Sequence, residues 1–186
     1  MDLERLERAT REILIAIGED PDREGLADTP RRVAKAWKEL TAGLHEDPRR
    51  HLGRVFHEKT EDLVIIRDIE VSSLCEHHLL PFTGVAHVAY LPAGGRVVGL
   101  SKIARTIETF ARRPQVQERL TAQIADTLME HLAPRGVAVI IDAEHACMKL
   151  RGVRQKRAVT TTLAFRGEID SDPQRRHEVL ALLGKG

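Results

Sequence analysis

The sequence predicts an α+β protein with a mostly antiparallel sheet, preceded by an N-terminal helical segment. Three observations support this fold class: helical spacing of apolar residues in the N-terminal part, β-branched apolar runs from residue 63 onwards, and two adjacent amphipathic segments between those runs. Apolar residues three to four positions apart are typical of helices, whereas β-branched apolar runs are typical of strands. Two hairpin-like strand pairs around a helical pair indicate an α+β domain.

The N-terminal part is predicted to form two helices joined by a polar linker. Apolar residues at helical spacing place the first helix over residues 2–17. The second begins at Thr29, which we expect to be the N-cap because Pro30 follows it in the first helical position. The chain is therefore expected to have an N-terminal helical appendage, residues 1–60, and a second domain, residues 61–186.

The second domain is predicted to hold the strands and three further helices. The predicted elements are a strand at residues 63–71, a hairpin at 83–100 that turns at Gly94-Gly95, helices at 101–113 and 115–132, strands at 136–150 and 157–165, and a closing helix at 173–183. Ser101 is expected to be the N-cap of the first of these helices. So few strands leave exposed sheet edges, and pairing into an oligomer would cover them.

Composition excludes several classes of function. The 186 residues suffice for one domain with a buried core, and the formal net charge of +1 gives no field that favours nucleic acid or an anionic membrane. The N-terminus is too acidic for a signal peptide, and no apolar run approaches membrane-spanning length. We therefore expect a cytoplasmic protein, in which the two cysteines bind metal, act in catalysis or stay reduced.

Two short segments carry the cysteines together with histidines. Cys75 and His78 are three positions apart, a spacing that can ligate one ion but that also fits a buried thiol beside a capping histidine. His145 and Cys147 are two positions apart, so in a strand both would point to the same face. If the two segments meet in the fold, thiolates and imidazoles together favour zinc.

The number of ligands would decide what such a zinc ion does. A closed site of two cysteines and two histidines would be structural, with His145 or His77 as the fourth ligand. An open site with one histidine would keep a water molecule, whose pKa the metal lowers towards about 7. The surplus histidines favour the open site because general acid–base catalysis needs imidazoles beside the metal.

Cationic residues lie near both segments. Ser101, Lys102 and Arg105 begin a predicted helix, whose N-terminal end favours an anion, and Arg151 follows the second cysteine. No Gly-rich phosphate loop is present, so side chains and a helix end would hold any phosphates. Glu118 is most simply a surface acid at a helix start, although a buried carboxylate there could also accept hydrogen bonds from a guanine edge.

Four stretches, in order, resemble the GTP cyclohydrolase I family: "CEHHLLPF", "GLSKIAR", "RRPQVQERLT" and "HACMKLRG". The upstream "DTPRRVAKAW" is similar to a helix of the family, whereas the tail "AFRGEIDSDPQRRHEVLALL" matches more loosely. The resemblance implies the tunnelling fold, in which sheets of several subunits join into a barrel. It also implies a homodecamer of two pentamers with active sites at subunit boundaries, and a catalytic role for residues 61–186.

The resemblance also implies a reaction and a role for each candidate residue. The reaction is the zinc-dependent hydrolysis of the guanine imidazole ring of GTP, which releases formate, forms 7,8-dihydroneopterin triphosphate and begins pterin and tetrahydrofolate biosynthesis. The resemblance implies that Cys75, His78 and Cys147 ligate zinc and that His77 and His145 act as acid–base catalysts. It implies that Glu118, with Gln117, binds guanine and that Ser101 relays protons near the ribose. The triphosphate would be bound by Lys102, Arg105, Arg151 and a neighbouring subunit's Arg32.

Two alternatives compete with this interpretation. The first is a closed zinc site that stabilises the fold of a nucleotide-binding protein. The second is another tunnelling-fold enzyme, either a pterin synthase relative that binds zinc through histidines alone or a nitrile reductase relative with a cysteine nucleophile and no zinc. The paired cysteines, the adjacent histidines and the "SKIAR" stretch speak against the second alternative.

Overall fold

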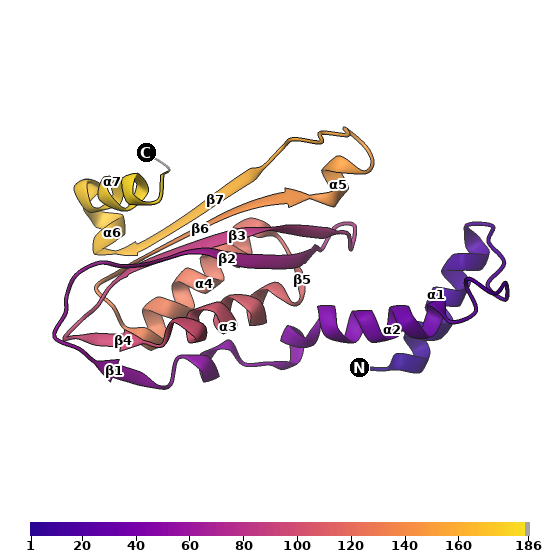
Figure 1. Cartoon of the computed structure of the whole chain (residues 1–186), viewed down its shortest axis with the longest axis horizontal. Coiled ribbons are helices and arrows are strands. Elements are labelled where there is room, and N and C mark those ends of the chain that lie inside the picture. The colour runs from indigo at the N-terminus through magenta and orange to yellow at the C-terminus, as the bar shows by residue number, and fades with distance from the viewer. Residues whose placement is uncertain (185–186) are drawn as a thin grey trace. The chain divides into compact units, whose positions relative to one another are not determined.

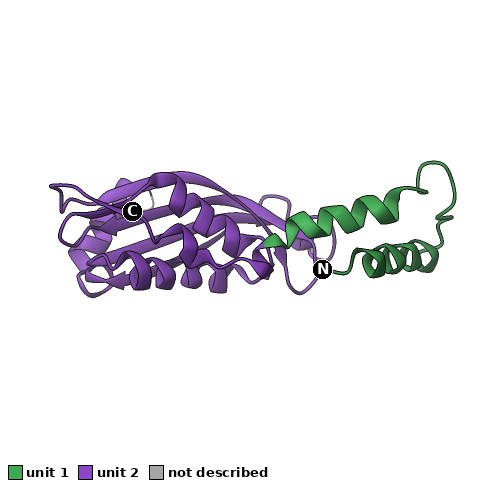
Figure 2. Ribbon diagram, turned by 90° about the horizontal axis from the view of Figure 1, so that it is seen from below, with its two compact units in different colours: residues 1–42 green, residues 43–186 purple. Residues whose placement is uncertain are grey.

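The structure is a computed structural model that describes residues 1–184. The chain divides into two compact units, unit 1 (Met1–Ala42) and unit 2 (Gly43–Gly186), which Figure 2 shows in separate colours. The expected division at residue 60 into an appendage and a catalytic domain stays a prediction. Within the described residues, no helix combines the length and apolar character needed to cross a membrane.

Unit 1 consists of two helices, α1 (Leu3–Ala16) and α2 (Thr29–Leu40). The Asp2 side chain accepts a hydrogen bond from the Arg5 backbone at 2.9 Å and so caps α1. The N-cap of α2 is Asp28 and not Thr29, because helical hydrogen bonding already begins with the Asp28 carbonyl, which accepts from the Arg32 backbone at 3.0 Å. Both predicted helices are otherwise confirmed.

Unit 2 contains an α+β arrangement, as the sequence predicts. Its strands are β1 (Val55–His57), β2 (Val64–Cys75), β3 (Pro81–Leu91), β4 (Arg96–Val98), β5 (Pro114–Gln115), β6 (Gly136–His145) and β7 (Thr160–Gly167). Its helices are α3 (Leu100–Ala111), α4 (Gln117–Leu132), α5 (Ala146–Lys149), α6 (Glu168–Ser171) and α7 (Pro173–Leu182). Two short 3-10 helices, η1 (Ala42–His45) and η2 (Pro48–His51), precede β1.

The main sheet has the strand order β5-β2-β3-β6-β7, and its neighbours are antiparallel except for the short β2–β5 pair. The predicted hairpin over residues 83–100 is wrong. Both edges of β3 are occupied by β2 and β6, so the segment after Gly94 and Gly95 cannot fold back onto β3. It forms β4, which pairs with β1 in a separate two-stranded sheet.

The two faces of the main sheet bury different helices. Alternate residues of β6 point to opposite faces, so Val137 and Val139 pack with α3 and α4 while Ala138 and Ile140 pack with α6 and α7. Figure 1 shows α3 and α4 along one face of the sheet, with α6 and α7 on the other face at one end. The opposite end of the sheet, where β2 and β6 finish, is left free of α6 and α7.

Two further boundaries differ from the sequence prediction. Helix α3 starts at Leu100 with Gly99 as N-cap, and the Lys102 backbone donates to the Gly99 carbonyl at 2.8 Å, so Ser101 lies inside the first turn. Strand β6 ends at His145, and Cys147 lies on the short helix α5. The argument that a shared strand face brings His145 and Cys147 together is therefore wrong, although both residues remain at the same end of the sheet.

Candidate metal centre and active site

The two cysteine-bearing segments meet at the end of the main sheet where β2 and β6 finish. We call residues 75–80 the β2 turn and residues 145–151 the β6 extension. The ligand atoms of Cys75, His78 and Cys147 all lie within 4.8 Å of one another. Cys75 is buried, Cys147 is half-buried and His78 is exposed, so the group is accessible from one side.

Backbone hydrogen bonds shape the β2 turn. The Leu79 backbone donates to the Cys75 carbonyl at 2.8 Å, and the Cys75 backbone donates to the Leu80 carbonyl at 2.8 Å. Leu79 adopts a φ of 56°, a left-handed conformation that lets the chain reverse directly after the histidines. This reversal leaves Cys75 in the core and turns His78 towards Cys147.

Two thiols and an imidazole form a donor set that can hold one metal ion. Burial raises the pKa of the Cys147 thiol, and the neighbouring Cys75 thiol raises it further. A bound cation would oppose both effects because it favours the thiolate form, so metal binding would release protons.

His145 lies beside this group but is not part of it. Its ring stacks on Phe82 with centroids 4.7 Å apart and an angle of 14° between the planes. Its Nε2 lies 2.8 Å from the Gln117 amide oxygen. Burial lowers the pKa of His145 below its usual 6.5, and the negative charge of Glu118 opposes this shift. The ring is therefore held in place and mostly uncharged near neutral pH.

The packing around His145 depends on a close approach of β3 and β6. Phe82 lies opposite His145 in the β3–β6 register, and Gly84 lies opposite Ala143. A Cβ atom at Gly84 would lie only 1.8 Å from the Asp142 carbonyl oxygen, so only glycine allows the two strands to pair there.

His77 occupies a more open position. Its side chain is 67% exposed, its Nδ1 lies 4.0 Å from the Cys75 sulfur, and its ring makes an edge contact with His78. Glu76 forms an ion pair with Arg119 of α4, and the Arg119 guanidinium lowers the pKa of that carboxyl group. The β2 turn is therefore tied to the start of α4 by an exposed contact.

Glu118 lies on the exposed side of the first turn of α4, whereas the guanine-binding alternative considered a buried carboxylate. It makes no hydrogen bond or ion pair with any of residues 1–184, so its carboxylate is available to a ligand. Gln117, its neighbour, is buried, and its amide bonds to three residues of β6 and β7, Ile141, Thr160 and Thr162.

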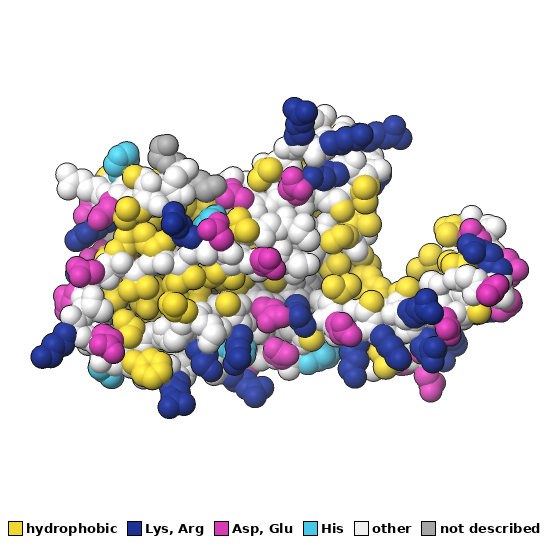
Figure 3. All heavy atoms as spheres, viewed as in Figure 1, with side chains coloured by type: hydrophobic (Ala, Val, Ile, Leu, Met, Phe, Trp, Pro, Cys, Tyr) yellow, Lys and Arg dark blue, Asp and Glu magenta, His cyan; other side chains and the backbone are white. Residues whose placement is uncertain are grey.

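Cations gather on the β6 extension and just beyond it. Arg151 Nη1 lies 3.3 Å from His78 Nε2, which places a positive charge at the edge of the cysteine–histidine group. Arg154, Lys156 and Arg157 follow it and are all exposed. Figure 3 shows Lys and Arg side chains projecting from this end of unit 2.

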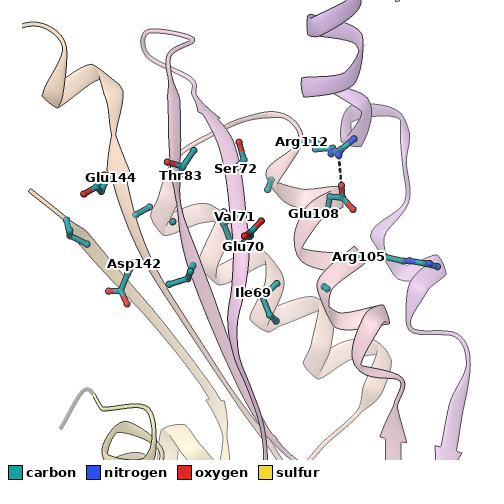
Figure 4. Close-up of a pocket in the computed structure, with 16 residues that line it drawn as sticks. Ile69, Glu70, Val71, Ser72, Thr83, Arg105, Glu108, Arg112, Asp142 and Glu144 are labelled. Carbon is teal, nitrogen blue, oxygen red and sulfur yellow. Dashed lines mark ion pairs between the residues drawn. The ribbon is translucent and has the colours of Figure 1, made fainter.

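The remaining predicted site residues lie elsewhere. Ser101, Lys102 and Arg105 are on α3, and in the described part of the chain no hydrogen bond or ion pair joins them to the cysteine–histidine group. Arg105 lines a separate cavity of about 1020 Å³ between α3 and the strands β2, β3 and β6, together with Glu108 and Arg112 (Figure 4). Arg32 lies in unit 1, where it pairs with Asp28 at 3.5 Å.

Comparison with known proteins identifies the family. The sequence model of GTP cyclohydrolase I matches residues 6–184. The chain is 58% identical over 183 residues to the GTP cyclohydrolase 1 of Geobacillus sp. strain WCH70, and 56% identical to that of Bacillus cytotoxicus. Each alignment covers 98% of this chain and 97% of the relative. The chain belongs to the GTP cyclohydrolase I family.

Membership of the GTP cyclohydrolase I family confirms the resemblance seen in the four motifs and makes the chain an enzyme. Among solved structures, the apo form of an archaeosine synthase QueF-Like protein aligns with 59% of this chain and 97% of its own, at 16% identity and a TM-score of 0.45. A likeness at that score supports no argument about this fold.

Three residues that contact the candidate site received no role in the sequence analysis: Phe82, Glu76 and Arg119. Phe82 and Glu76 lie inside the "CEHHLLPF" motif, and Arg119 lies inside "RRPQVQERLT". Their positions in these motifs were the available signal. Their contacts depend on the β3–β6 register and on the placement of α4.

Proposed function

We propose that this enzyme is a GTP cyclohydrolase I that hydrolyses the guanine imidazole ring of GTP, releases formate and forms 7,8-dihydroneopterin triphosphate. One observation supports this proposal above the others. Cys75, His78 and Cys147 converge, while His145 lies beside them with its own partners in the protein. Because the chain belongs to a family of enzymes, we interpret this arrangement as a catalytic metal site with one open coordination position and an imidazole next to it.

We further propose that the bound metal is zinc, which accepts two cysteine thiolates and one histidine and leaves a fourth position open. When bound, zinc would supply Lewis-acid chemistry and make a water molecule acidic enough to attack at neutral pH. The enzyme's own side chains would then orient the guanine ring and move protons. His145 would protonate guanine N7, which makes C8 electrophilic, and the exposed His77 would act as a second acid–base group.

The remaining contacts would bind the substrate. The free carboxylate of Glu118 would accept hydrogen bonds from guanine N1–H and the exocyclic amino group. Arg151, at the edge of the cysteine–histidine group, would bind the triphosphate together with Lys102 and Arg105. Ser101 near the ribose, a guanine contact from Gln117, and Arg32 of a neighbouring subunit stay predictions.

Within a single chain, Lys102 and Arg105 of α3 are not joined to the cysteine–histidine group, so the proposed substrate site is incomplete. We therefore propose the tunnelling fold and a decamer of two pentamers. Among residues 1–184, the outer edge of β2 pairs only with β5, at Leu74 and Cys75, and β7 is the last strand of the sheet. These edges can pair with neighbouring copies, and such pairing would bring α3 of one copy near the cysteine–histidine group of the next. Native mass spectrometry should report ten chains. A monomer that releases formate would overturn this part of the proposal.

We expect the assembly in the cytoplasm.

The central experiment measures zinc per chain and formate release from GTP on one purified sample, beside the variants His145→Ala and His177→Ala. His177 is an exposed histidine on α7 and serves as the control. We expect zinc in all three proteins, and formate from the parent and the control only. Loss of zinc from His145→Ala, with no formate from the parent, would instead indicate a closed structural site in a nucleotide-binding protein.

A further inference from the structure

The Gln117 side chain has one orientation that satisfies its surroundings. It is 2% exposed at the start of α4. Its amide nitrogen lies 2.9 Å from the Ile141 carbonyl, 2.9 Å from the Thr160 carbonyl and 3.2 Å from the Thr162 hydroxyl. Backbone carbonyl oxygens can only accept hydrogen bonds, so the nitrogen end of the amide must face them. Both amide hydrogens are then used by two neighbouring strands.

This orientation directs the Gln117 amide oxygen at His145 Nε2, 2.8 Å away. An amide oxygen is an acceptor only, so the hydrogen of this bond belongs to the imidazole ring. A neutral His145 must therefore carry its proton on Nε2 and its lone pair on Nδ1. Nδ1 makes no hydrogen bond with any residue that the structure describes.

A second contact fixes the plane of the same ring. Phe82, which is fully buried, stacks on His145 at 4.7 Å and 14°. Stacking alone would still allow the ring to flip by 180° about its Cβ–Cγ bond, which exchanges Nδ1 with Cδ2 and Nε2 with Cε1. The hydrogen bond to Gln117 removes that freedom because only Nε2–H satisfies the amide oxygen.

We propose that Gln117 is a positioning residue that holds His145 as the Nε2–H tautomer and leaves Nδ1 for the substrate. The proposal rests on the proposed function, in which His145 exchanges a proton with guanine. His145 then takes up a proton at Nδ1 before it protonates guanine and releases it again from Nδ1, while the Nε2 proton stays on the imidazole ring and is donated to the Gln117 oxygen. Gln117 would therefore act on kcat, whereas a guanine contact would act mainly on KM.

The test compares Gln117→Leu, which loses the acceptor oxygen at similar volume, with Gln117→Glu, which keeps an acceptor. Gln123→Leu is the control, because the Gln123 amide lies on the same helix and bonds to Gln115 outside the site. Solid-state NMR of zinc-loaded protein with ¹⁵N-labelled histidine reports the tautomer of His145, whose signals are assigned by their absence in His145→Ala. Zinc content, kcat and KM are measured on the same samples.

We expect a single Nε2–H tautomer in the parent and in Gln123→Leu, and a mixture of tautomers in Gln117→Leu. In Gln117→Leu, kcat should fall by about 10²-fold with KM and zinc content unchanged, since general acid–base catalysis contributes about that much. Gln117→Glu should recover the tautomer and part of kcat.

An Nδ1–H parent, or a Gln117→Leu variant that keeps one tautomer and full kcat, would overturn the proposal. A rise in KM with kcat unchanged would overturn it too, in favour of a guanine contact. A parent that releases no formate would reject the proposed function instead, and the tautomer measurement would still decide the position of the proton. If neither Gln117 variant folds, the parent decides, because an Nδ1–H tautomer there is enough to overturn the proposal.

Discussion

The β2 turn and the β6 extension meet at one site, but different forces hold them. The β2 turn is closed by its own backbone hydrogen bonds and tied to α4 by the exposed Glu76–Arg119 ion pair. The β6 extension starts from His145, whose ring is held by the buried side chains of Phe82 and Gln117. Backbone geometry thus arranges metal ligands, whereas core side chains arrange the neighbouring imidazole. Substitutions should therefore separate metal binding from catalysis.

The largest effect should come from removing a cysteine on either side. Cys147→Ala and Cys75→Ala should both lose zinc and all formate release, because either change leaves only two ligands. They should differ in stability. Cys75 is 7% exposed within the core, so its loss should cost about 1 kcal/mol of unfolding free energy in metal-free protein, whereas loss of the half-buried Cys147 should cost less. Denaturant unfolding with added chelator measures the difference, and equal costs would contradict it.

Glu118→Ala should come next and should affect catalysis without affecting the metal. Loss of two charge-assisted hydrogen bonds to guanine should lower kcat/KM for GTP by about 10³-fold, with zinc content unchanged. Glu130→Ala is the matched control, since Glu130 is an exposed acid near the other end of α4. Full activity in Glu118→Ala would remove its proposed role.

Arg151→Glu tests the charge at the edge of the β6 extension. The substitution replaces a cation by an anion, so it should raise the KM for GTP by about 10-fold. The KM for guanosine, which has no phosphates, should rise much less. Arg157→Glu makes the same charge change in an exposed residue of the following segment and should have little effect. Equal changes for both substrates would show that Arg151 does not bind the triphosphate.

The last expected effect is on zinc affinity alone, and it should come from the exposed ion pair between Glu76 of the β2 turn and Arg119. Glu76→Gln should weaken zinc binding by about 10-fold, as residues that orient metal ligands commonly do, while kcat of zinc-loaded enzyme stays unchanged. Competition with a chelator measures the affinity. Arg119→Leu should have the same effect, and the double variant should be no worse. Additive losses would show that the two residues act separately.

The same ion pair has a defined pH dependence. Arg119 lowers the pKa of Glu76 below its usual 4.5, so the contact is complete above that value. Its contribution is lost as the pH falls through the lower pKa of the folded state, because protonation of Glu76 then becomes favourable. Zinc affinity near pH 7 should therefore not depend on this pair's titration.

Local patterns predicted the helices well, and distant pairing explains the errors. The spacing of apolar residues placed α1, α2, α4 and α7 to within a few residues. The partner of β4 could not be predicted, because it depends on both edges of β3 being occupied. Residue spacing likewise could not show that Cys147 lies on a helix after β6.

For the candidate site, the sequence likewise predicted the residue types but not their contacts. The motifs identified the cysteines and histidines, because those residue types carry metal chemistry. They did not indicate the contacts of Gln117 and Phe82 with His145, which depend on the β3–β6 register and on how α4 packs against β6 and β7. In addition, the separation of Arg105 from the cysteines becomes visible only in the folded chain.

The closeness of the two cysteines also has a consequence for oxidation. Their sulfur atoms lie within 4.8 Å of each other, so a modest shift of the β6 extension would bring them to disulfide distance. A metal ion would occupy the thiolates and prevent this reaction. Protein stripped by a chelator in air should therefore lose its capacity to rebind zinc until a thiol reductant is added, while protein stripped under reductant should rebind zinc at once. The metal would then act as the protecting group of its own binding site.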